Sequence, residues 1–287
     1  MNAAELRGVS YVYSKNTPFC KVAVNNIDIA FEEKIVTGII GHTGSGKSTV
    51  SQMLNGLLKP SEGVVLVEDK DIWSEPKKIR NVRFAVGLVF QYPEYQLFEE
   101  TVYKDIAYGP KNMGLSESEI DERVRMAASL VGITEDMFDK SPFDLSGGWK
   151  RRVAIAGVMA MRPKILILDE PAAGLDPRGR DEILSRIVEY RRSTDSTVIM
   201  ISHSMEDMAV YCEKILVMSD SKPFMYGTPA EVFSKSAELE SVGLAVPQVT
   251  KLMTELKARG YHVRTDIYTV AQAKAEIARL VKEGAVC

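Results

Sequence analysis

The segment GHTGSGKST, residues 41–49, constrains the fold more than any other stretch of the chain. It fits the pattern G-x-x-x-x-G-K-[ST] and lies between a continuously apolar run, IVTGII at 35–40, and a helical pattern, VSQMLNGLL at 50–58. We expect that helix to end at Lys59–Pro60. A loop between a buried strand and a helix lets backbone N–H groups surround phosphates, so the segment predicts a nucleoside-triphosphate site.

Within this phosphate loop (residues 41–49), Lys47 is expected to reach the terminal phosphates and the Ser48 hydroxyl to bind Mg²⁺. A flexible glycine turn is the structural alternative, and the strand and helix on either side argue against it. The residues that we assign to nucleotide binding here are Gly41, His42, Thr43, Gly44, Ser45, Gly46, Lys47, Ser48 and Thr49.

A second element, ILILDE at 165–170, supports the same function. Its four apolar residues predict a buried strand with Asp169 and Glu170 at the carboxyl end, where open α/β sheets bind ligands. Asp169 is expected to hold Mg²⁺ through water, and Glu170 to act as general base on the attacking water. An exposed acidic strand end is the alternative, and it is less plausible beside a phosphate loop.

Three further side chains are candidates for the same site. Gln91 follows the strand pattern GLVF and is expected to contact Mg²⁺ and the attacking water, while His203 follows TVIMIS and can donate to a γ-phosphate. Each is equally well interpreted as an ordinary polar residue at a strand end. Tyr13 is a candidate for stacking on the nucleotide base, with a core tyrosine as an alternative of similar weight.

The stretch LSGG at 145–148 is a candidate anion site of another kind. Ser146 is expected to be a helix N-cap, and Gly147 and Gly148 leave the first backbone N–H groups uncovered. Unsatisfied N–H groups and the helix dipole both favour a bound anion at such an end.

Composition narrows the class of protein. The formal net charge is −3 with basic residues spread along the chain, which does not favour nucleic acid as a partner. Cys20, Cys212 and Cys287 lie far apart in no metal-ligand spacing, which argues for a reducing cytosol. No apolar signal region begins the chain, and the longest apolar run, about nine residues at 153–161, is far below the ~18 that cross a bilayer. We therefore expect a soluble, cytosolic chain that reaches a membrane only through a partner.

The order of patterns predicts an α/β fold. Strands are expected at 9–13, 22–31, 35–40, 84–90 and 164–170, a mostly helical segment at about 92–163, and alternating strands and helices after it. Ser116 and Glu119 form a capping box in the helical segment. This order indicates a parallel-centred sheet with a helical subdomain.

The composition changes after Pro229, and we interpret residues 236–287 as a small α-rich appendage to a main domain at 1–235. One amphipathic helix is expected before Gly260, and a second is expected to be capped by Thr269 and Gln272. The apolar side chains assigned to these two helices are Val249, Leu252, Met253, Leu256, Ile277, Leu280 and Val281.

Taken together, the phosphate loop, Gln91, LSGG, ILILDE, GLD at 174–176 and His203 occur in the order typical of ABC-type ATPases, which the chain resembles over about residues 5–235. The segments FQYPEYQLFEETVYKDIAYGPKNMG and RRVAIAGVMAMRPKILILDEPAAGLDP look more narrowly like the ATPases of energy-coupling factor importers, and more like the A-prime subunit than its sister A. The resemblance implies an ABC nucleotide-binding domain, with an antiparallel β subdomain beside the parallel-centred sheet, that binds ATP and Mg²⁺.

The resemblance also implies partners. In ABC ATPases two subunits pack head to tail, so Ser146, Gly147 and Gly148 would grip the γ-phosphate of ATP held by the partner, and Asp176 would lie at that interface. The second ATPase is a sister A subunit or a second copy. The two-helix appendage is similar to an extension that contributes to this pairing. A transmembrane coupling subunit, and indirectly a substrate-binding membrane protein, would hold the chain at the cytoplasmic face of the membrane.

The sequence departs from the family pattern at two positions. Trp149 stands where glutamine follows LSGG, and Ala172 stands where threonine is usual. Trp149 offers no amide, and it either stacks on a sugar or packs against the partner. This departure puts in doubt the hydrolysis rate at the site that this LSGG closes, while Glu170 and His203 still predict a competent half-site in this chain.

The segment 92–110 is rich in aromatic residues. These rings either pack the helical subdomain or help form a groove for a short helix of a membrane partner. Pro93 and Glu94 would then let phosphate occupancy move that groove. The aromatic residues are Tyr92, Tyr95, Phe98, Tyr103 and Tyr108.

The leading functional prediction is an import motor for a vitamin or a transition-metal ion. A soluble ABC ATPase acting on DNA or ribosomes is a weaker alternative, because the chain offers no long coiled-coil insertion, zinc cysteines or second ATPase domain. The ATPase of an ordinary importer is the third, and the segment from Gln91 to Pro110 argues against it.

Overall fold

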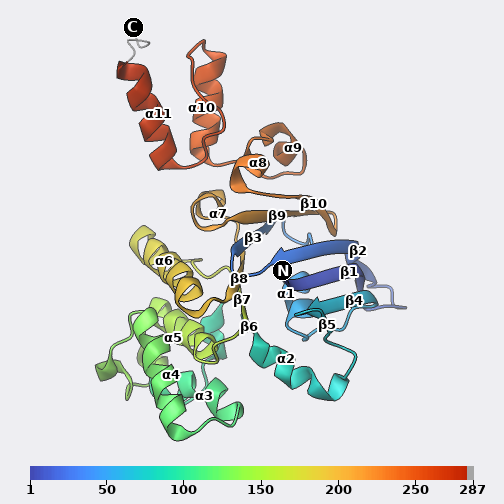
Figure 1. Ribbon diagram of the computed structural model, residues 1–287, viewed down its shortest axis with the longest axis vertical. Helices are drawn as coiled ribbons and strands as arrows, with labels where there is room; N and C mark the ends of the chain where they lie inside the picture. The colour runs from blue at the N-terminus through green and yellow to red at the C-terminus, as the bar shows by residue number, and fades with distance from the viewer. Residues whose placement is uncertain (283–287) are drawn as a thin grey trace.

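The computed structural model describes residues 1–282, in which the strands form two sheets (Figure 1). The larger sheet has the order β10-β9-β3-β8-β7-β6, parallel except for β10, and the smaller, antiparallel sheet has the order β2-β1-β4-β5. The strands are β1 (Asn2–Tyr13), β2 (Lys21–Glu32), β3 (Val36–Gly41), β4 (Glu62–Val67), β5 (Lys70–Asp71), β6 (Val86–Val89), β7 (Ile165–Asp169), β8 (Thr197–Ile201), β9 (Lys214–Ser219) and β10 (Lys222–Gly227).

The helices connect and cover these sheets. In Figure 1 the helical subdomain of α3, α4 and α5 lies on one side of the large sheet, and the small sheet lies on the other. The α-helices are α1 (Lys47–Leu54), α2 (Ile79–Ala85), α3 (Val102–Asn112), α4 (Glu117–Leu130), α5 (Gly147–Met159), α6 (Pro177–Thr194), α7 (Met205–Tyr211), α8 (Pro229–Phe233), α9 (Ser236–Ser241), α10 (Gln248–Ala258) and α11 (Val270–Lys282).

The central strands are apolar because both faces of the sheet are covered. Every residue of β3, β6, β7 and β8 is buried, as expected for parallel strands between two layers. One apolar cluster joins the sheet to the helical subdomain, α6 and α7, and a second joins it to α1 and the small sheet. The predicted parallel-centred sheet with antiparallel and helical parts is confirmed.

Two predicted boundaries are wrong for local reasons. Helix α1 ends at Leu54, before Lys59–Pro60, because Gly56 takes the left-handed conformation with φ of 69°. Phe84 and Ala85, predicted as the start of a strand, end helix α2 instead. The capping box is confirmed: Glu119 N–H donates to Ser116 Oγ, and Ser116 N–H donates to Glu119 Oε2.

The C-terminal helices α10 and α11 lie side by side at one end of the molecule (Figure 1) and share a small apolar cluster. Thr269 and Gln272 cap α11 as predicted, through reciprocal hydrogen bonds. The predicted apolar faces are only partly confirmed, because Leu252, Ile277 and Val281 are exposed. The buried residues of this cluster are Met253, Val263, Ile267, Ala273 and Leu280.

The segment that leads from the main domain to helix α10 packs in the core of the main domain. Leu239, Leu244 and Val246 are buried in the cluster that the helical subdomain shares with the sheet. The independently packed part of the appendage therefore begins near α10, and we propose residue 247 in place of 236 as its start.

The two described cysteines differ in exposure. Cys20 is exposed and Cys212 is buried, while Cys287 lies outside the described residues. No helix within residues 1–282 is both long and apolar enough to cross a membrane.

Candidate nucleotide-binding site

The phosphate loop is held tightly between β3 and α1. Lys47 is buried, and its Nζ donates to the carbonyl oxygens of Gly41, at 2.7 Å, and His42, at 3.0 Å. Burial lowers the pKa of Lys47, and the nearby charges of Asp169 and Glu170 oppose that shift. The lysine therefore sits in a low-dielectric position where a phosphate charge would be a strong partner.

Gly46 shows why the loop requires glycine. Its φ is 103°, and an added Cβ would lie 2.4 Å from the carbonyl oxygen of Ala23. Any side chain at this position would therefore distort the loop or displace β2.

Strand β7 brings Asp169 to the loop. Ser48 Oγ donates to Asp169 Oδ2 at 2.8 Å, so the two predicted Mg²⁺ ligands are in direct contact. Burial raises the pKa of Asp169, while the Ser48 hydrogen bond and the positive charge of Lys47 act in the opposite direction.

Glu170 follows in a strained conformation with φ of 53°. Its N–H donates to the carbonyl of Ile201 at 2.9 Å, which ties the residue to β8. Burial, and then the charge of Asp169, raise the pKa of Glu170 to about 7, which is near the pH at which a general base works best. Its buried Oε1 atom has no hydrogen-bond donor among the described residues.

His203 lies beside this carboxylate. His203 Nε2 is 3.6 Å from Glu170 Oε1, and just over half of the histidine side chain is exposed. Burial, and then the charge of Lys47, lower the pKa of His203, so the imidazole is neutral at pH 7 and can donate from one nitrogen.

Tyr13 and Gln91 differ in their contacts with the residues of the phosphate-loop site. Tyr13 and Thr49 share a hydrogen bond of 3.3 Å between their hydroxyls and line a cavity of about 170 Å³ together with Lys21 and the loop. Gln91 is exposed just beyond β6, and no hydrogen bond joins it to Ser48, Asp169 or Glu170 among the described residues. The structure thus brings Tyr13 to the loop, whereas Gln91 makes no hydrogen bond to the acidic residues among residues 1–282.

Lys21 is a further basic residue at the phosphate loop that no sequence motif marks. Its Nζ would lie 3.6 Å from a Cβ added at Gly44, so it adds a positive charge at the phosphate loop. A lone lysine that opens a strand has no local pattern to mark it. Its proximity depends on the pairing of β1 with β2.

The LSGG segment lies at the start of α5, in the helical subdomain. Ser146 occupies the N-cap position, as predicted, but its side chain makes no capping hydrogen bond. Open space surrounds the position of a Cβ at Gly147. Because first-turn N–H groups have no intrahelical partner, this end is uncovered in the single chain. Among residues 1–282, no hydrogen bond or ion pair joins residues 146–148 to the phosphate loop.

Asp176 caps helix α6, and its Oδ1 accepts from Gly179 N–H at 2.9 Å. Trp149 packs on its own chain: the Arg152 guanidinium lies 5.3 Å from the ring centroid, and that arginine also pairs with Glu182. Ala172, the second departure from the family pattern, is buried in the main cluster.

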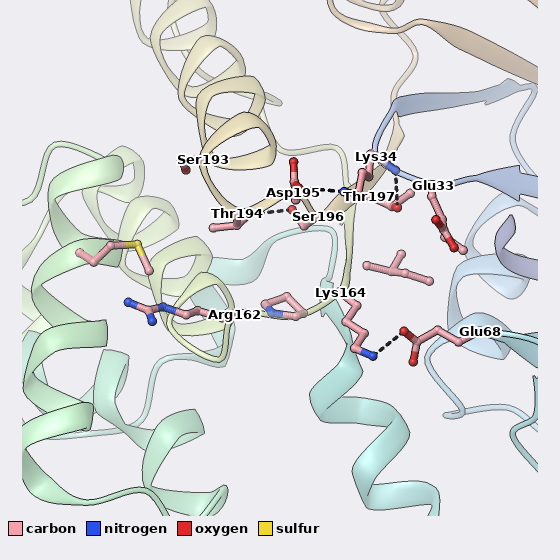
Figure 2. Close-up of a pocket in the computed structure, with 14 residues that line it drawn as sticks. Glu33, Lys34, Glu68, Arg162, Lys164, Ser193, Thr194, Asp195, Ser196 and Thr197 are labelled. Atoms are coloured by element: carbon pink, nitrogen blue, oxygen red, sulfur yellow. Dashed lines mark hydrogen bonds and ion pairs between the residues drawn. The ribbon is translucent and has the colours of Figure 1, made fainter. Parts of the chain in front are cut away.

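A separate cavity of about 590 Å³ lies at the amino-terminal ends of β7 and β8, the opposite edge from Asp169 and Glu170 (Figure 2). Its lysines already have acidic partners, since Lys34 pairs with Asp195 at 2.8 Å and Lys164 pairs with Glu68. Arg162, the third cation in its lining, pairs with Glu122 at 2.7 Å, so the described lining residues offer no unpaired positive charge to a phosphate.

The fold and the site define a P-loop ATPase in which the LSGG segment begins a helix of the helical subdomain and makes no hydrogen bond to the phosphate loop among the described residues. A family model described as ABC transporter matches residues 24–173. The chain therefore belongs to the ABC transporter family and, within it, to the energy-coupling factor transporter ATP-binding proteins.

Relatives of this name are similar along nearly their whole length. The protein called energy-coupling factor transporter ATP-binding protein EcfA2 of Caldanaerobacter subterraneus subsp. tengcongensis is 52% identical, with 97% of each chain covered. The protein of the same name from Clostridium acetobutylicum is 53% identical over 97% of this chain and 98% of its own. A solved structure of cbiO1 from Clostridium perfringens, described as part of the ABC transporter complex cbiONQ, matches with a TM-score of 0.75 and 40% identity over 88% of this chain and 99% of that one.

Proposed function

We propose that this chain is the ATP-hydrolysing motor subunit of an energy-coupling factor importer, powering uptake of a vitamin or a transition-metal ion. The observation that carries the proposal is the group formed by Lys47, Ser48, Asp169, Glu170 and His203 around one phosphate loop. The identity of about 50% to proteins named energy-coupling factor transporter ATP-binding protein supports the transport role over a soluble ATPase acting on nucleic acid.

The residues fit a magnesium ion. Mg²⁺ prefers oxygen ligands, and Ser48 Oγ and Asp169 Oδ2 lie 2.8 Å apart at the mouth of the loop. We assign metal binding to these two groups, with Gln91 joining them after a movement of the segment that follows β6. When bound, Mg²⁺ would neutralise charge on the transferring phosphate.

The hydrolytic step then depends on the residues at the ends of β7 and β8. Lys47 binds the terminal phosphates, and Glu170 accepts a proton from the attacking water once it is ionised. His203, whose Nε2 lies 3.6 Å from Glu170 Oε1, donates to the γ-phosphate. Tyr13 is positioned next to Thr49 to contact the nucleoside part of ATP.

The chain by itself carries two half-sites. We propose that Ser146, Gly147 and Gly148 close over ATP on a second ATPase subunit, and that Asp176 lies at the interface. The uncovered start of α5 supports this proposal, because its N–H groups have no partner within the helix. The second ATPase is a sister A subunit or a second copy of this chain.

The aromatic segment after Gln91 supports contact with a transmembrane coupling subunit. Tyr103 packs inside the helical subdomain, where its ring lies 5.6 Å from that of Phe138, so it is a structural residue. The other four rings are exposed, and we assign them to the groove that receives a helix of the membrane partner. They are Tyr92, Tyr95, Phe98 and Tyr108. This contact would place the chain at the cytoplasmic face of the membrane, with the substrate-binding membrane protein reached indirectly.

The test is the solution mass and the turnover of purified Glu170→Gln protein, measured by light scattering with and without MgATP. Removal of the general base should lower hydrolysis by a factor of about 10²–10⁴ while ATP still binds. The trapped ATP should then hold two chains together if copies of this chain complete each other's sites.

Each outcome is informative. A shift from monomer to dimer supports pairing of two copies, and a monomer that binds ATP assigns the second place to a sister A subunit. Near-normal turnover would remove Glu170 from the role of base. Failure of the wild-type chain to bind MgATP would overturn the proposed function.

A further inference from the structure

Arg151 is a buried cation that lies between the two half-sites of this chain. It is on α5, one helical turn after Gly147, and only 6% of its side chain is exposed. Its Nη1 donates to the carbonyl oxygen of Ala173, and its Nη2 donates to the carboxylate of Glu94 at 3.3–3.4 Å. One guanidinium thus joins three segments that are distant in sequence.

Both contacts lie in segments assigned to the site of the phosphate loop. Ala173 is in the turn between Glu170 and Asp176, and Glu94 comes three residues after Gln91. The same turn also contacts the LSGG segment directly, because a Cβ added at Gly148 would lie 3.4 Å from Leu175 Cδ2. The start of α5 therefore rests on the turn that follows the general base.

The chemistry of arginine suits such a junction. A buried charge is costly unless it is paired, and Glu94 is the acidic partner of Arg151 among the described residues. The planar guanidinium offers donors in fixed directions, so it can serve a carbonyl and a carboxylate at once. Lysine keeps the charge but concentrates its donors at one atom, so it would not hold both partners in the same geometry.

We propose that Arg151 is a positioning residue that makes the LSGG segment respond to nucleotide on the phosphate loop of the same chain. The inference rests on the proposed function. Movement of Gln91 and Glu94 toward bound phosphate shifts Arg151, and α5 moves with it. The LSGG segment is then offered to the second ATPase only when its own chain is loaded.

Trp149 provides a reporter for this movement. The chain has two tryptophans, so Trp73→Phe leaves Trp149 alone, two residues from Arg151 at the start of α5. ATP affinity is measured separately by calorimetry with MgATP, in a Trp73→Phe, Glu170→Gln background that prevents turnover. Trp149 emission is then followed during the same titration.

The variants are Arg151→Lys, Glu94→Gln and a matched control, Arg191→Lys. Arg191 has the same kinds of partner, since it donates to the carbonyl of Lys34 at 2.9 Å and to Glu213 at 2.6 Å, but it joins α6 to the segments just before β3 and β9. It reproduces the loss of a part-buried arginine without touching α5. Glu94 is partly exposed, so Glu94→Gln tests the link even where Arg151→Lys fails to fold.

ATP should change Trp149 emission in the background protein and in Arg191→Lys. In Arg151→Lys and Glu94→Gln we expect that change to be lost while ATP affinity stays within about twofold, as for independent sites. An unchanged emission response in both variants would overturn the proposal, and so would ATP binding to the background protein with no response at all. Absence of ATP binding to the background protein would instead contradict the proposed function itself.

Discussion

The phosphate loop and the LSGG segment both have backbone N–H groups that could bind an anion, but the two segments are packed in opposite ways. The loop is packed so closely that a Cβ at Gly46 would meet the backbone of β2, and its lysine is already hydrogen-bonded. The LSGG segment has open space at Gly147 and no side-chain cap. The phosphate loop is therefore packed within its own chain, whereas we propose that the LSGG segment is covered by a second ATPase subunit.

Because of this difference, substitutions in the two segments should affect different properties of the protein. Substitutions in the loop disturb contacts that hold the fold together, so they should damage folding and nucleotide binding at once. Substitutions at the start of α5 disturb few contacts in the single chain. Their cost should appear when a second ATPase is present.

The largest expected contrast is between Gly46→Ala and Gly147→Ala. In Gly46→Ala the added methyl group would clash with the Ala23 carbonyl, and the alanine backbone would have to adopt a φ of 103°. We therefore expect loss of MgATP binding and a lower thermal midpoint. A methyl group at Gly147 meets nothing in the single chain, so ATP affinity and thermal midpoint should stay at wild-type values while hydrolysis by the assembled pair falls. Calorimetry, thermal melts and turnover measure the three quantities. Weak ATP binding by Gly147→Ala would contradict the inference that the LSGG segment plays no part in ATP binding by the single chain.

A smaller effect is expected from the pH dependence of stability at Glu170. Its pKa is raised from 4.5 to about 7 in the folded chain, so the folded state binds this proton more tightly than the unfolded state does. Stability from this group is therefore present below pH 4.5 and is lost as the pH rises through 7. Glu170→Gln should raise the thermal midpoint by a few degrees at pH 8, and the gain should vanish toward pH 4.5. A gain that does not vary with pH would contradict the raised pKa.

The smallest effect is expected at Trp149. Its ring packs under Arg152 within the helical subdomain, a contact worth about 0.5–1 kcal/mol at an exposed site. Trp149→Gln should therefore lower the free energy of unfolding slightly and leave turnover of the assembled pair equal or higher. Denaturant unfolding and steady-state hydrolysis test both. A collapse of turnover would show that the tryptophan acts on the partner's nucleotide.

The sequence predicts the self-contained region well because its information is local. A strand, a glycine loop and a helix follow one another at 35–54, and four consecutive apolar residues predict the strand that ends in Asp169. Tertiary packing explains what was missed. Arg151 contacts partners far along the chain, Lys21 reaches the loop only through strand pairing, and Leu252, Ile277 and Val281 follow a helical period yet remain exposed.

The place of β3 in the sheet has a consequence for synthesis. The strand that leads into the phosphate loop pairs with β8 and β9, which begin at Thr197 and Lys214. At about 5–20 residues per second, the ribosome needs on the order of ten seconds or more to supply those neighbours after β3 has emerged. Until then the loop has no sheet to fix it. We therefore expect ATP binding to require a chain that has been translated and folded through β9, and a product truncated before β9 to bind ATP weakly.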